Sequence, residues 1–127
     1  MTPSDNPSFA LTVQIERNTI VVHVAGDLDY ETCDELVRTV DGRLAQWPKD
    51  GPRLAALHLD FTELGDVDSM GLSALLTIRR RTDAAAIGLS LDERPPALQR
   101  LLEITGSLEH LTAPYEERRA GEQPGAG

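Results

Sequence analysis

The fold of this chain is decided by residues Leu57–Ile78, which read LHLDFTELGDVDSMGLSALLTI. The apolar run Leu54–Phe61 overlaps the start of this stretch. It is interrupted by only two polar residues and is typical of a central strand covered on both faces. An acidic turn follows at Gly65–Ser69, and apolar residues then recur at helical spacing over Met70–Arg81. A strand, a turn and a helix in this order predict one β-α unit of a parallel sheet.

The segments on either side continue the alternation of strands and helices. Apolar and polar side chains alternate from Phe9 to Glu16, and a short turn leads to a second strand at Ile20–Val24, so we expect an antiparallel hairpin. Gly26 ends the second strand. The further expected elements are a helix at Cys33–Trp47, a strand at Ile87–Leu91, a helix from Pro95 to Gly106, and an edge strand or helical turn at Leu108–Tyr115.

This order predicts an α/β fold with a mixed, mostly parallel β-sheet, an N-terminal hairpin and helices packed on the sheet. We expect one domain at residues 9–115, a size at which a core needs neither disulfides nor metal. Residues 1–8 are polar with two prolines, and residues 116–127 are charged and then rich in glycine and proline. These segments are predicted to be a disordered N-terminus and a flexible tail.

The composition restricts the classes of partner. Acidic residues number 21 against 12 basic ones, so the formal net charge is −9. Nucleic acid and anionic membrane surfaces need a clustered positive patch, and we therefore expect neither as a partner. No apolar run is long enough to cross a bilayer, and the N-terminus lacks the basic and apolar regions of a secretory signal. We expect a cytoplasmic protein that is a monomer or weak dimer when free.

Two acidic segments follow strands and precede helices. They are Gly26–Asp29 after the second strand and Gly65–Ser69 after the third. In a right-handed β-α-β arrangement both lie at the same end of the sheet, where the sites of α/β proteins are usually found. We therefore expect Asp29 to lie near Asp68 and Ser69, although the sequence separates them.

Ser69, at the start of a helix, has three interpretations. Asp68 and Ser69 are both of the residue types that cap helices, a role that stabilises by about 1 kcal/mol. A phosphoacceptor is the second, because a helix N-terminus favours added negative charge while the acidic neighbours oppose it. A serine nucleophile is the third, but no Gly-x-Ser-x-Gly elbow is present and no histidine stands in a recognisable relation to Ser69. Gly71 either packs tightly on the sheet or lets a partner come close.

The other side chains offer little chemistry. Three scattered histidines and one cysteine give no metal-ligand spacing, and neither a calcium loop nor a phosphate-cradling glycine loop is present. We therefore expect no metal, no cofactor and no catalytic residue. Cys33 lies on the apolar side of its helix and is expected to be buried. The run Arg79–Arg81 is assigned to the helix dipole and to solubility, with partner docking as the alternative.

Three motifs together resemble the STAS-domain anti-sigma factor antagonists, a family of small bacterial regulators. They are Gly26-Asp27-Leu28-Asp29, Leu57-His58-Leu59-Asp60 and Asp68-Ser69-Met70-Gly71-Leu72. The segment Leu98–Gly106 also resembles the third helix of that family, so the match covers nearly all of the expected domain. Two positions depart from the family pattern: Asp27 replaces a more usual glutamate, and Asp66 stands where an apolar residue is more common.

The resemblance implies a phosphorylation-switched binding module and not an enzyme. In that family the unphosphorylated protein binds an anti-sigma factor that is itself a serine kinase, and thereby frees a sigma factor for transcription. Phosphorylation of the serine, here Ser69, ends the binding, and a serine phosphatase restores it. The residues to which we assign partner binding are Asp27, Asp29, Asp66, Asp68, Met70 and Gly71. The alternative is a STAS scaffold subunit of a stress-sensing or transporter-associated assembly, without a phospho-switch.

Overall fold

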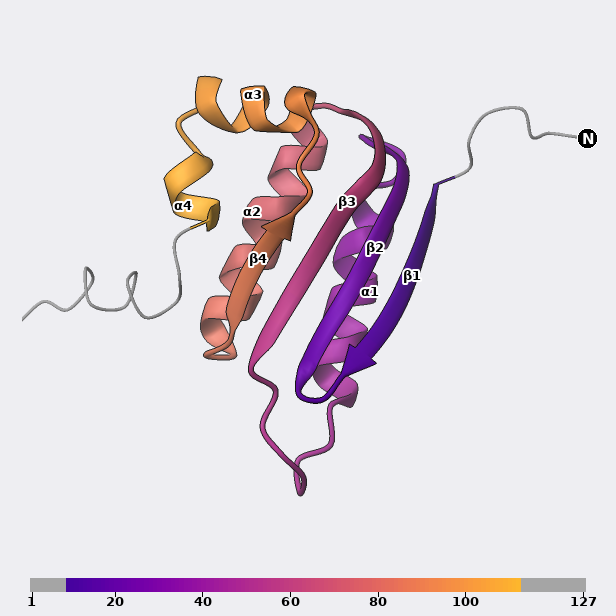
Figure 1. The fold of residues 1–127 in the computed structure, drawn as a ribbon, viewed down its shortest axis with the longest axis vertical. Coiled ribbons are helices and arrows are strands. Elements are labelled where there is room, and N and C mark those ends of the chain that lie inside the picture. Colours follow the sequence, from indigo (N-terminus) through magenta and orange to yellow (C-terminus); the bar gives the residue numbers. More distant parts are fainter. Residues whose placement is uncertain (1–8, 113–127) are drawn as a thin grey trace, which may run out of the picture.

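The computed structural model describes residues 9–112, which form an α/β unit (Figure 1). The predicted disordered N-terminus and flexible tail, together with residues 113–115 of the predicted domain, lie outside the described residues. In chain order the elements are β1 (Ala10–Glu16), β2 (Thr19–Leu28), α1 (Cys33–Gln46), β3 (Ala56–Val67), α2 (Ser69–Ala84), β4 (Gly88–Asp92), α3 (Pro96–Ile104) and α4 (Leu108–Thr112).

The sheet confirms the predicted mixed topology. Its strands lie in the order β1-β2-β3-β4, with β1 antiparallel to β2 and the other three strands parallel to one another. Ile20 of β2 is paired with Ile15 across the hairpin and with Leu57 on β3, and Leu57 is paired with Leu89 on β4. Apolar side chains therefore form rows that cross the sheet.

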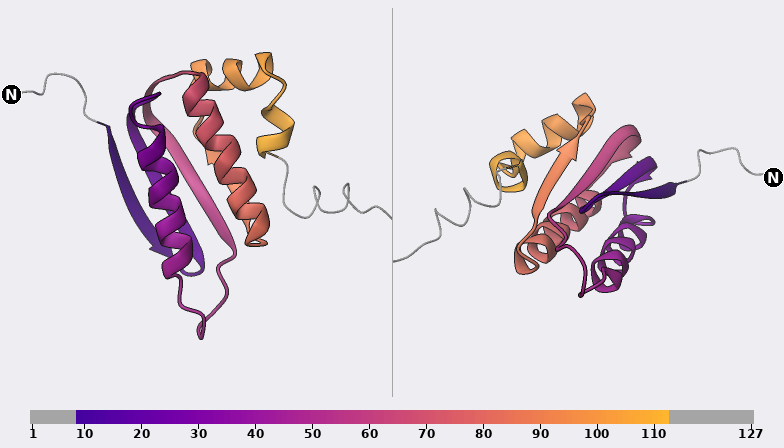
Figure 2. Two further views of the ribbon diagram at one scale, coloured as in Figure 1. Left: turned by 180° about the vertical axis from the view of Figure 1, so that it is seen from behind. Right: turned by 60° about the horizontal axis from the view of Figure 1, so that its bottom comes forward.

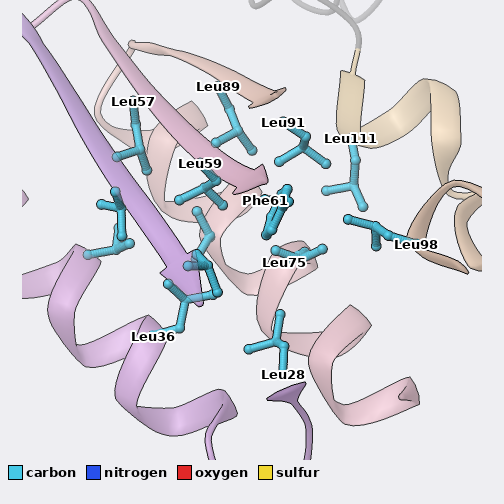
Figure 3. Packing of buried hydrophobic residues seen from close by; sticks show 14 of the residues in the cluster. Leu28, Leu36, Leu57, Leu59, Phe61, Leu75, Leu89, Leu91, Leu98 and Leu111 are labelled. Carbon is cyan, nitrogen blue, oxygen red and sulfur yellow. The ribbon is translucent and has the colours of Figure 1, made fainter. Parts of the chain in front are cut away.

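Helices α1 and α2 cover one face of this sheet (Figure 2). Alternate residues of β2, β3 and β4 are buried, while the residues between them are partly exposed. Figure 3 shows the core on the helix side, where Phe61 lies near Leu75 of α2 and near Leu98 and Leu111 of the C-terminal helices. Among the described residues no helix covers the other face of β3. The expectation of a strand covered on both faces is therefore wrong, because this unit has a single layer of helices.

Both central strands run further than predicted. β2 continues to Leu28 through Gly26, which adopts a φ of 92°, and β3 continues to Val67 through Gly65. Two register shifts accommodate these residues, and the pairing resumes with Leu28 opposite Val67. The predicted ends of β2 at Gly26 and of β3 at Phe61 are therefore wrong, and the first part of the turn predicted at Gly65–Ser69 belongs to β3, because backbone pairing between the two glycine-containing segments extends the sheet.

The helices lie where they were predicted, with shifted ends. α2 begins at Ser69 and reaches Ala84 instead of spanning Met70–Arg81, and α3 follows Pro95 as expected. At Leu108–Thr112 the helical alternative is confirmed. Cys33, the first residue of α1, is buried as predicted.

Arg79 does not belong to an exposed basic run. Its side chain is only 1% exposed, lies 3.3 Å from the carboxylate of Asp83, and donates to the carbonyl of Leu111 over 3.5 Å. Arg81, in contrast, is a surface residue that pairs with Asp41 of α1 at 2.9 Å. The solubility role assigned to this run is therefore wrong for Arg79, because α4 packs against α2 and the arginine joins the two helices.

Candidate functional site

The predicted site residues lie at the carboxyl ends of β2 and β3, where the chain enters α2. Leu28 is paired with Val67, and the amide of Asp68 donates to the carbonyl of Leu28 over 3.3 Å. Asp29 follows Leu28 and therefore lies at the same end of the sheet as Asp68 and Ser69, as the topology predicts. We call this region, made by Asp27, Asp29, Asp66, Asp68 and Ser69, the acidic end.

Asp68, and not Ser69, caps helix α2. The backbone of Asp68 is extended, with φ −119° and ψ −172°, and its carboxylate accepts hydrogen bonds from the amides of Met70 at 2.9 Å and Gly71 at 3.0 Å. Ser69 is the first residue of the helix and is exposed. Within residues 9–112 its hydroxyl makes no hydrogen bond, so of the two capping candidates only Asp68 has that role. The serine hydroxyl is left accessible to a partner.

Gly71 fixes the start of α2 against the sheet. It is buried, and a Cβ built at this position would lie 2.5 Å from the carbonyl oxygen of Leu28 and 2.9 Å from a methyl carbon of Val67. Such distances are shorter than van der Waals contact, so only glycine fits without movement. The tight-packing interpretation of Gly71 therefore has direct support, whereas contact between its backbone and a partner remains a prediction.

Asp27 holds the end of β3 in place. Its carboxylate accepts a hydrogen bond from the amide of Asp66 over 2.8 Å. The neighbouring Gly65 leaves room for this contact, since a Cβ at Gly65 would collide with the Asp27 carboxylate. Asp66 itself is exposed, and its carboxylate has no hydrogen bond or ion pair among the described residues. Asp27 is thus a structural residue of the site, and Asp66 is available to a partner.

Asp29 organises the turn that leads into α1. Its carboxylate accepts from the amide of Glu31 at 2.9 Å and from the hydroxyl of Thr32 at 3.3 Å, and its carbonyl accepts from the amide of Cys33 at 2.8 Å. Thr32 also donates to the carbonyl of Asp27 at 2.8 Å. These contacts join the end of β2 to the start of α1, whose N-cap residue Thr32 makes no side-chain capping hydrogen bond.

In the described part of the chain, the carboxylates of the acidic end form no salt bridge with a cation. The salt bridges within residues 9–112 join His23 to Asp60, His58 to Asp92, Arg79 to Asp83 and Arg81 to Asp41. None includes an aspartate of the acidic end. Ser69 lies at the positive end of the α2 dipole and belongs to the same group of side chains as these carboxylates. Added negative charge on Ser69 would therefore change the electrostatic potential of this surface strongly.

Two large apolar side chains are exposed near these carboxylates. Met70, in the first turn of α2, is 43% exposed, and its assignment to partner binding stays a prediction. Tyr30, directly after Asp29, is 74% exposed and was missed from the sequence. The sequence does contain a weak indication of Tyr30. It is an aromatic residue between two acidic ones, in a chain with only 4% aromatic residues. Exposed tyrosines are common anchors in protein interfaces.

A second polar cluster lies outside the acidic end, on the sheet face without helices. Asp60 accepts from the hydroxyl of Thr62 at 2.6 Å and from its amide at 2.9 Å, and pairs with His23 at 3.0 Å. The two hydrogen bonds from Thr62 are the main reason that the pKa of Asp60 lies below its ordinary value; burial opposes them, and His23 adds a lesser lowering effect. His23 and His58 are thus engaged on this face, and neither serves Ser69 as a base.

No other class of site is evident in the described part of the chain. Within residues 9–112 no group of three or more histidine, cysteine, aspartate or glutamate side chains is arranged to hold a metal ion. Within the same residues no helix has the length and apolar character needed to span a membrane. Among the described residues, the acidic end is a group of exposed and half-buried carboxylates around an accessible serine.

Comparisons with known proteins identify the fold. A protein-family model described as "Mlab, STAS domain" matches residues 11–112. No curated protein sequence is significantly similar to the chain. An anti-sigma factor antagonist from Mycobacterium paratuberculosis is 24% identical, with a TM-score of 0.65 and 84% of each chain covered.

Two further solved structures have the same fold. The Bacillus cell fate determinant SpoIIAA, in its phosphorylated form, is 21% identical, with a TM-score of 0.60 over 79% of this chain and 85% of that chain. A sulfate transporter family protein from Wolinella succinogenes is 16% identical, with a TM-score of 0.62 over 77% and 75% of the two chains. At these identities the likeness concerns the fold.

Proposed function

This chain belongs to the STAS-domain family, and on that premise we propose that it is an anti-sigma factor antagonist switched by phosphorylation of Ser69. In its unphosphorylated form it binds a serine-kinase anti-sigma factor through the acidic end. Phosphorylation by that kinase releases it, and a serine phosphatase restores binding. The protein is a regulatory binding module with no catalytic residue of its own.

The observation that carries this proposal is the division of roles between Asp68 and Ser69. Asp68 caps α2, so the exposed hydroxyl of Ser69 is not needed as a cap and can be modified without breaking a hydrogen bond to any described residue. The fold relatives are consistent with such a switch, because SpoIIAA has been solved in forms named phosphorylated and unphosphorylated.

The physical basis of release is a change of charge within the docking surface. A phosphate on Ser69 adds about −1.5 to −2 charges beside carboxylates that form no salt bridge within residues 9–112. The amides of Met70 and Gly71 are already occupied by Asp68, so the phosphate competes with that carboxylate for the positive end of α2. An interface fitted to a neutral serine then has to desolvate a dianion, which opposes binding.

The direct test is mass spectrometry of the purified protein after incubation with ATP and the serine-kinase anti-sigma factors of its own cell. We expect one phosphate, mapped to Ser69 and absent from Ser69→Ala. Ser73→Ala is the matched control, because Ser73 is exposed on the same helix one turn later, and it is expected to be phosphorylated normally at Ser69. Phosphate that persists in Ser69→Ala would contradict the assignment.

The second candidate function is a STAS scaffold subunit without a phospho-switch. It is favoured by the family-model description, which names Mlab, and by the fold shared with a sulfate transporter family protein. A scaffold subunit binds its partner constitutively. The observation that would establish it in place of the switch is tight binding to a purified partner that Ser69→Asp leaves unchanged, with no phosphate transferred by any candidate kinase.

A third possibility, a serine hydrolase, has no support in the geometry. Catalysis by serine needs a base within hydrogen-bond distance of the hydroxyl. Among the described residues no side chain hydrogen-bonds to Ser69, and the His23 and His58 rings pair with Asp60 and Asp92. We therefore expect no labelling of Ser69 by a serine-reactive phosphonate probe.

A further inference from the structure

The end of the molecule opposite the acidic end carries a surface that the switch does not use. Helix α1 ends there at Trp47, and residues 47–55 lead to β3 at the bottom of Figure 1. Trp47 lines two depressions, of about 350 Å³ and about 420 Å³. The first extends to Ile15 of β1, and the second extends to Ile87, next to β4. We call the two depressions with Trp47 between them the Trp47 surface.

This surface is formed in advance of any binding. The indole Nε1 of Trp47 donates to the carbonyl of Pro52 over 2.8 Å, which fixes the ring relative to the loop. Pro48 and Pro52 restrict the loop backbone on either side of Gly51, and all three line the first depression. Ile15 remains 51% exposed beside them. A rigid apolar site of this kind loses little conformational entropy on binding.

The rim of the Trp47 surface is basic, although the chain as a whole is strongly acidic. Arg43 lines the first depression, and Lys49 and Arg53 line the second, while no carboxylate of residues 9–112 lines either one. Within residues 9–112 none of these three cations takes part in an ion pair, in contrast to Arg81, which is paired with Asp41. Asp50, in the same loop, is exposed but lines neither depression.

We propose that the Trp47 surface is a second docking site, which binds an acidic segment of a partner protein through large apolar side chains placed on either side of Trp47. Charge complementarity selects the occupant, since three cations without an ion pair among the described residues surround an apolar centre that no described carboxylate lines. The composition of the Trp47 surface also fits this role, because tryptophan and arginine are enriched among the residues that carry interface energy. This site lies at the far end of both helices from Ser69, so a partner here and a partner at the acidic end can bind together.

Trp47 supplies the means of testing this proposal, because it is the only tryptophan in the chain. Its emission reports directly on occupancy of the two depressions. The probe is a short synthetic peptide in which one Phe and one Leu are flanked by glutamates, titrated into the full-length protein at low and at physiological salt. Two matched peptides serve as controls, one with alanines in place of Phe and Leu, and one with lysines in place of the glutamates.

We expect the acidic apolar peptide to change the Trp47 emission with saturation, and the two control peptides to bind at least about tenfold more weakly. The double variant Arg43→Glu/Arg53→Glu should lose the binding. Its matched control is Arg80→Glu/Arg100→Glu, which makes the same change of net charge at exposed positions outside both depressions and should bind as the wild type does. Ser69→Asp should also bind normally, because this docking does not depend on the switch.

Three results would overturn the proposal. One is the absence of a saturable response to the acidic apolar peptide. Another is equal loss of binding in Arg80→Glu/Arg100→Glu, which would mean that net charge alone is responsible. The third is self-association of the wild-type protein in sedimentation velocity that Arg43→Glu/Arg53→Glu abolishes, which would make a second copy of this chain the occupant.

Discussion

Replacement of Gly71 by alanine is expected to destabilise the protein, although alanine is the better helix former. Two effects of opposite sign compete at this position. Removing a glycine from a helix interior stabilises it by up to about 1 kcal/mol. Against this, the new methyl group would lie 2.5 Å from the carbonyl oxygen of Leu28 and 2.9 Å from Val67. The first contact is with backbone, so no side-chain rotation can relieve it.

The magnitude follows from what has to move. The Leu28 carbonyl also accepts a hydrogen bond from the amide of Asp68. This bond ties the end of β2 to the start of α2, so the carbonyl cannot move freely away from the new methyl group. Overpacking in a well-packed region typically costs about 1–3 kcal/mol. After the helix-propensity gain is subtracted, we expect a net loss of about 1–2 kcal/mol in the free energy of unfolding.

Gly42 provides the matched control. It lies inside α1, and a Cβ built on it would meet nothing within 4 Å. Gly42→Ala therefore keeps the propensity gain without a clash and is expected to stabilise by up to about 1 kcal/mol. The same chemical change in two helices of one protein should thus have opposite signs.

Urea unfolding followed by circular dichroism measures both variants. With a urea dependence of about 2 kcal/mol per molar, the midpoint of Gly71→Ala should fall by roughly 0.5–1 M, and that of Gly42→Ala should rise by up to roughly 0.5 M. The comparison of midpoints requires that the wild type and both variants have the same urea dependence of the free energy of unfolding. An increase in the midpoint of Gly71→Ala would refute the packing argument and return Gly71 to the group of residues kept for a partner.

The remaining predictions concern the cap, the polar sheet face and the buried arginine. Asp68→Ala should lower the free energy of unfolding by about 0.5–2 kcal/mol, while Ser69→Ala should change it by less than about 0.5 kcal/mol in urea titrations; a comparable loss in Ser69→Ala would show that its hydroxyl has a structural role. The pKa of Asp60 is lower in the folded state than in the unfolded state. The Asp60 carboxylate therefore contributes stability at pH values above the unfolded pKa, and this stability is lost as the pH falls through the folded pKa. Thr62→Val should raise the pKa of Asp60 in carboxyl NMR titrations and weaken the acid dependence of stability, whereas an unchanged pKa would mean that the hydroxyl bond is unimportant. Arg79→Ala should cost about 2–4 kcal/mol and speed amide exchange in α4, with Arg79→Met less damaging; unaltered exchange in α4 would contradict the role of Arg79 in joining it to α2.

The elements that could be predicted from the sequence are those whose pattern directly reflects burial. Apolar and polar residues alternate in β1, and apolar residues recur at helical spacing in α1. Each pattern arises because the element has one apolar face, and the spacing of residues in the sequence shows that face directly. The mixed sheet and the common location of the two acidic segments followed from the order of the elements, because chain topology restricts how β-α units assemble. For this reason Asp29 and Ser69 could be placed at one end of the sheet from the sequence alone.

What could not be predicted depends on contacts between distant segments. Gly26 and Gly65 look like turn residues, but they continue β2 and β3 because the two segments pair with each other and Asp27 satisfies the amide of Asp66. Arg79 looks like its two exposed neighbours, and only the packing of α4 distinguishes it. The spacing of residues along the chain does not show which distant segments pair or pack together. These errors therefore arise from contacts that local sequence patterns cannot predict.

The arrangement of the acidic end explains why an aspartate and a serine are adjacent at the start of α2. If Ser69 capped the helix, its hydroxyl would be engaged in a hydrogen bond, and modification would first have to break the cap. Since Asp68 performs that task through the amides of Met70 and Gly71, the helix start is stable while the serine next to it stays exposed. The packing of Gly71 on Leu28 then holds that serine at a fixed place relative to both strand ends. A residue that is free to react but fixed in position is what a kinase and a binding partner both require, and this combination favours a switch over a constitutive scaffold.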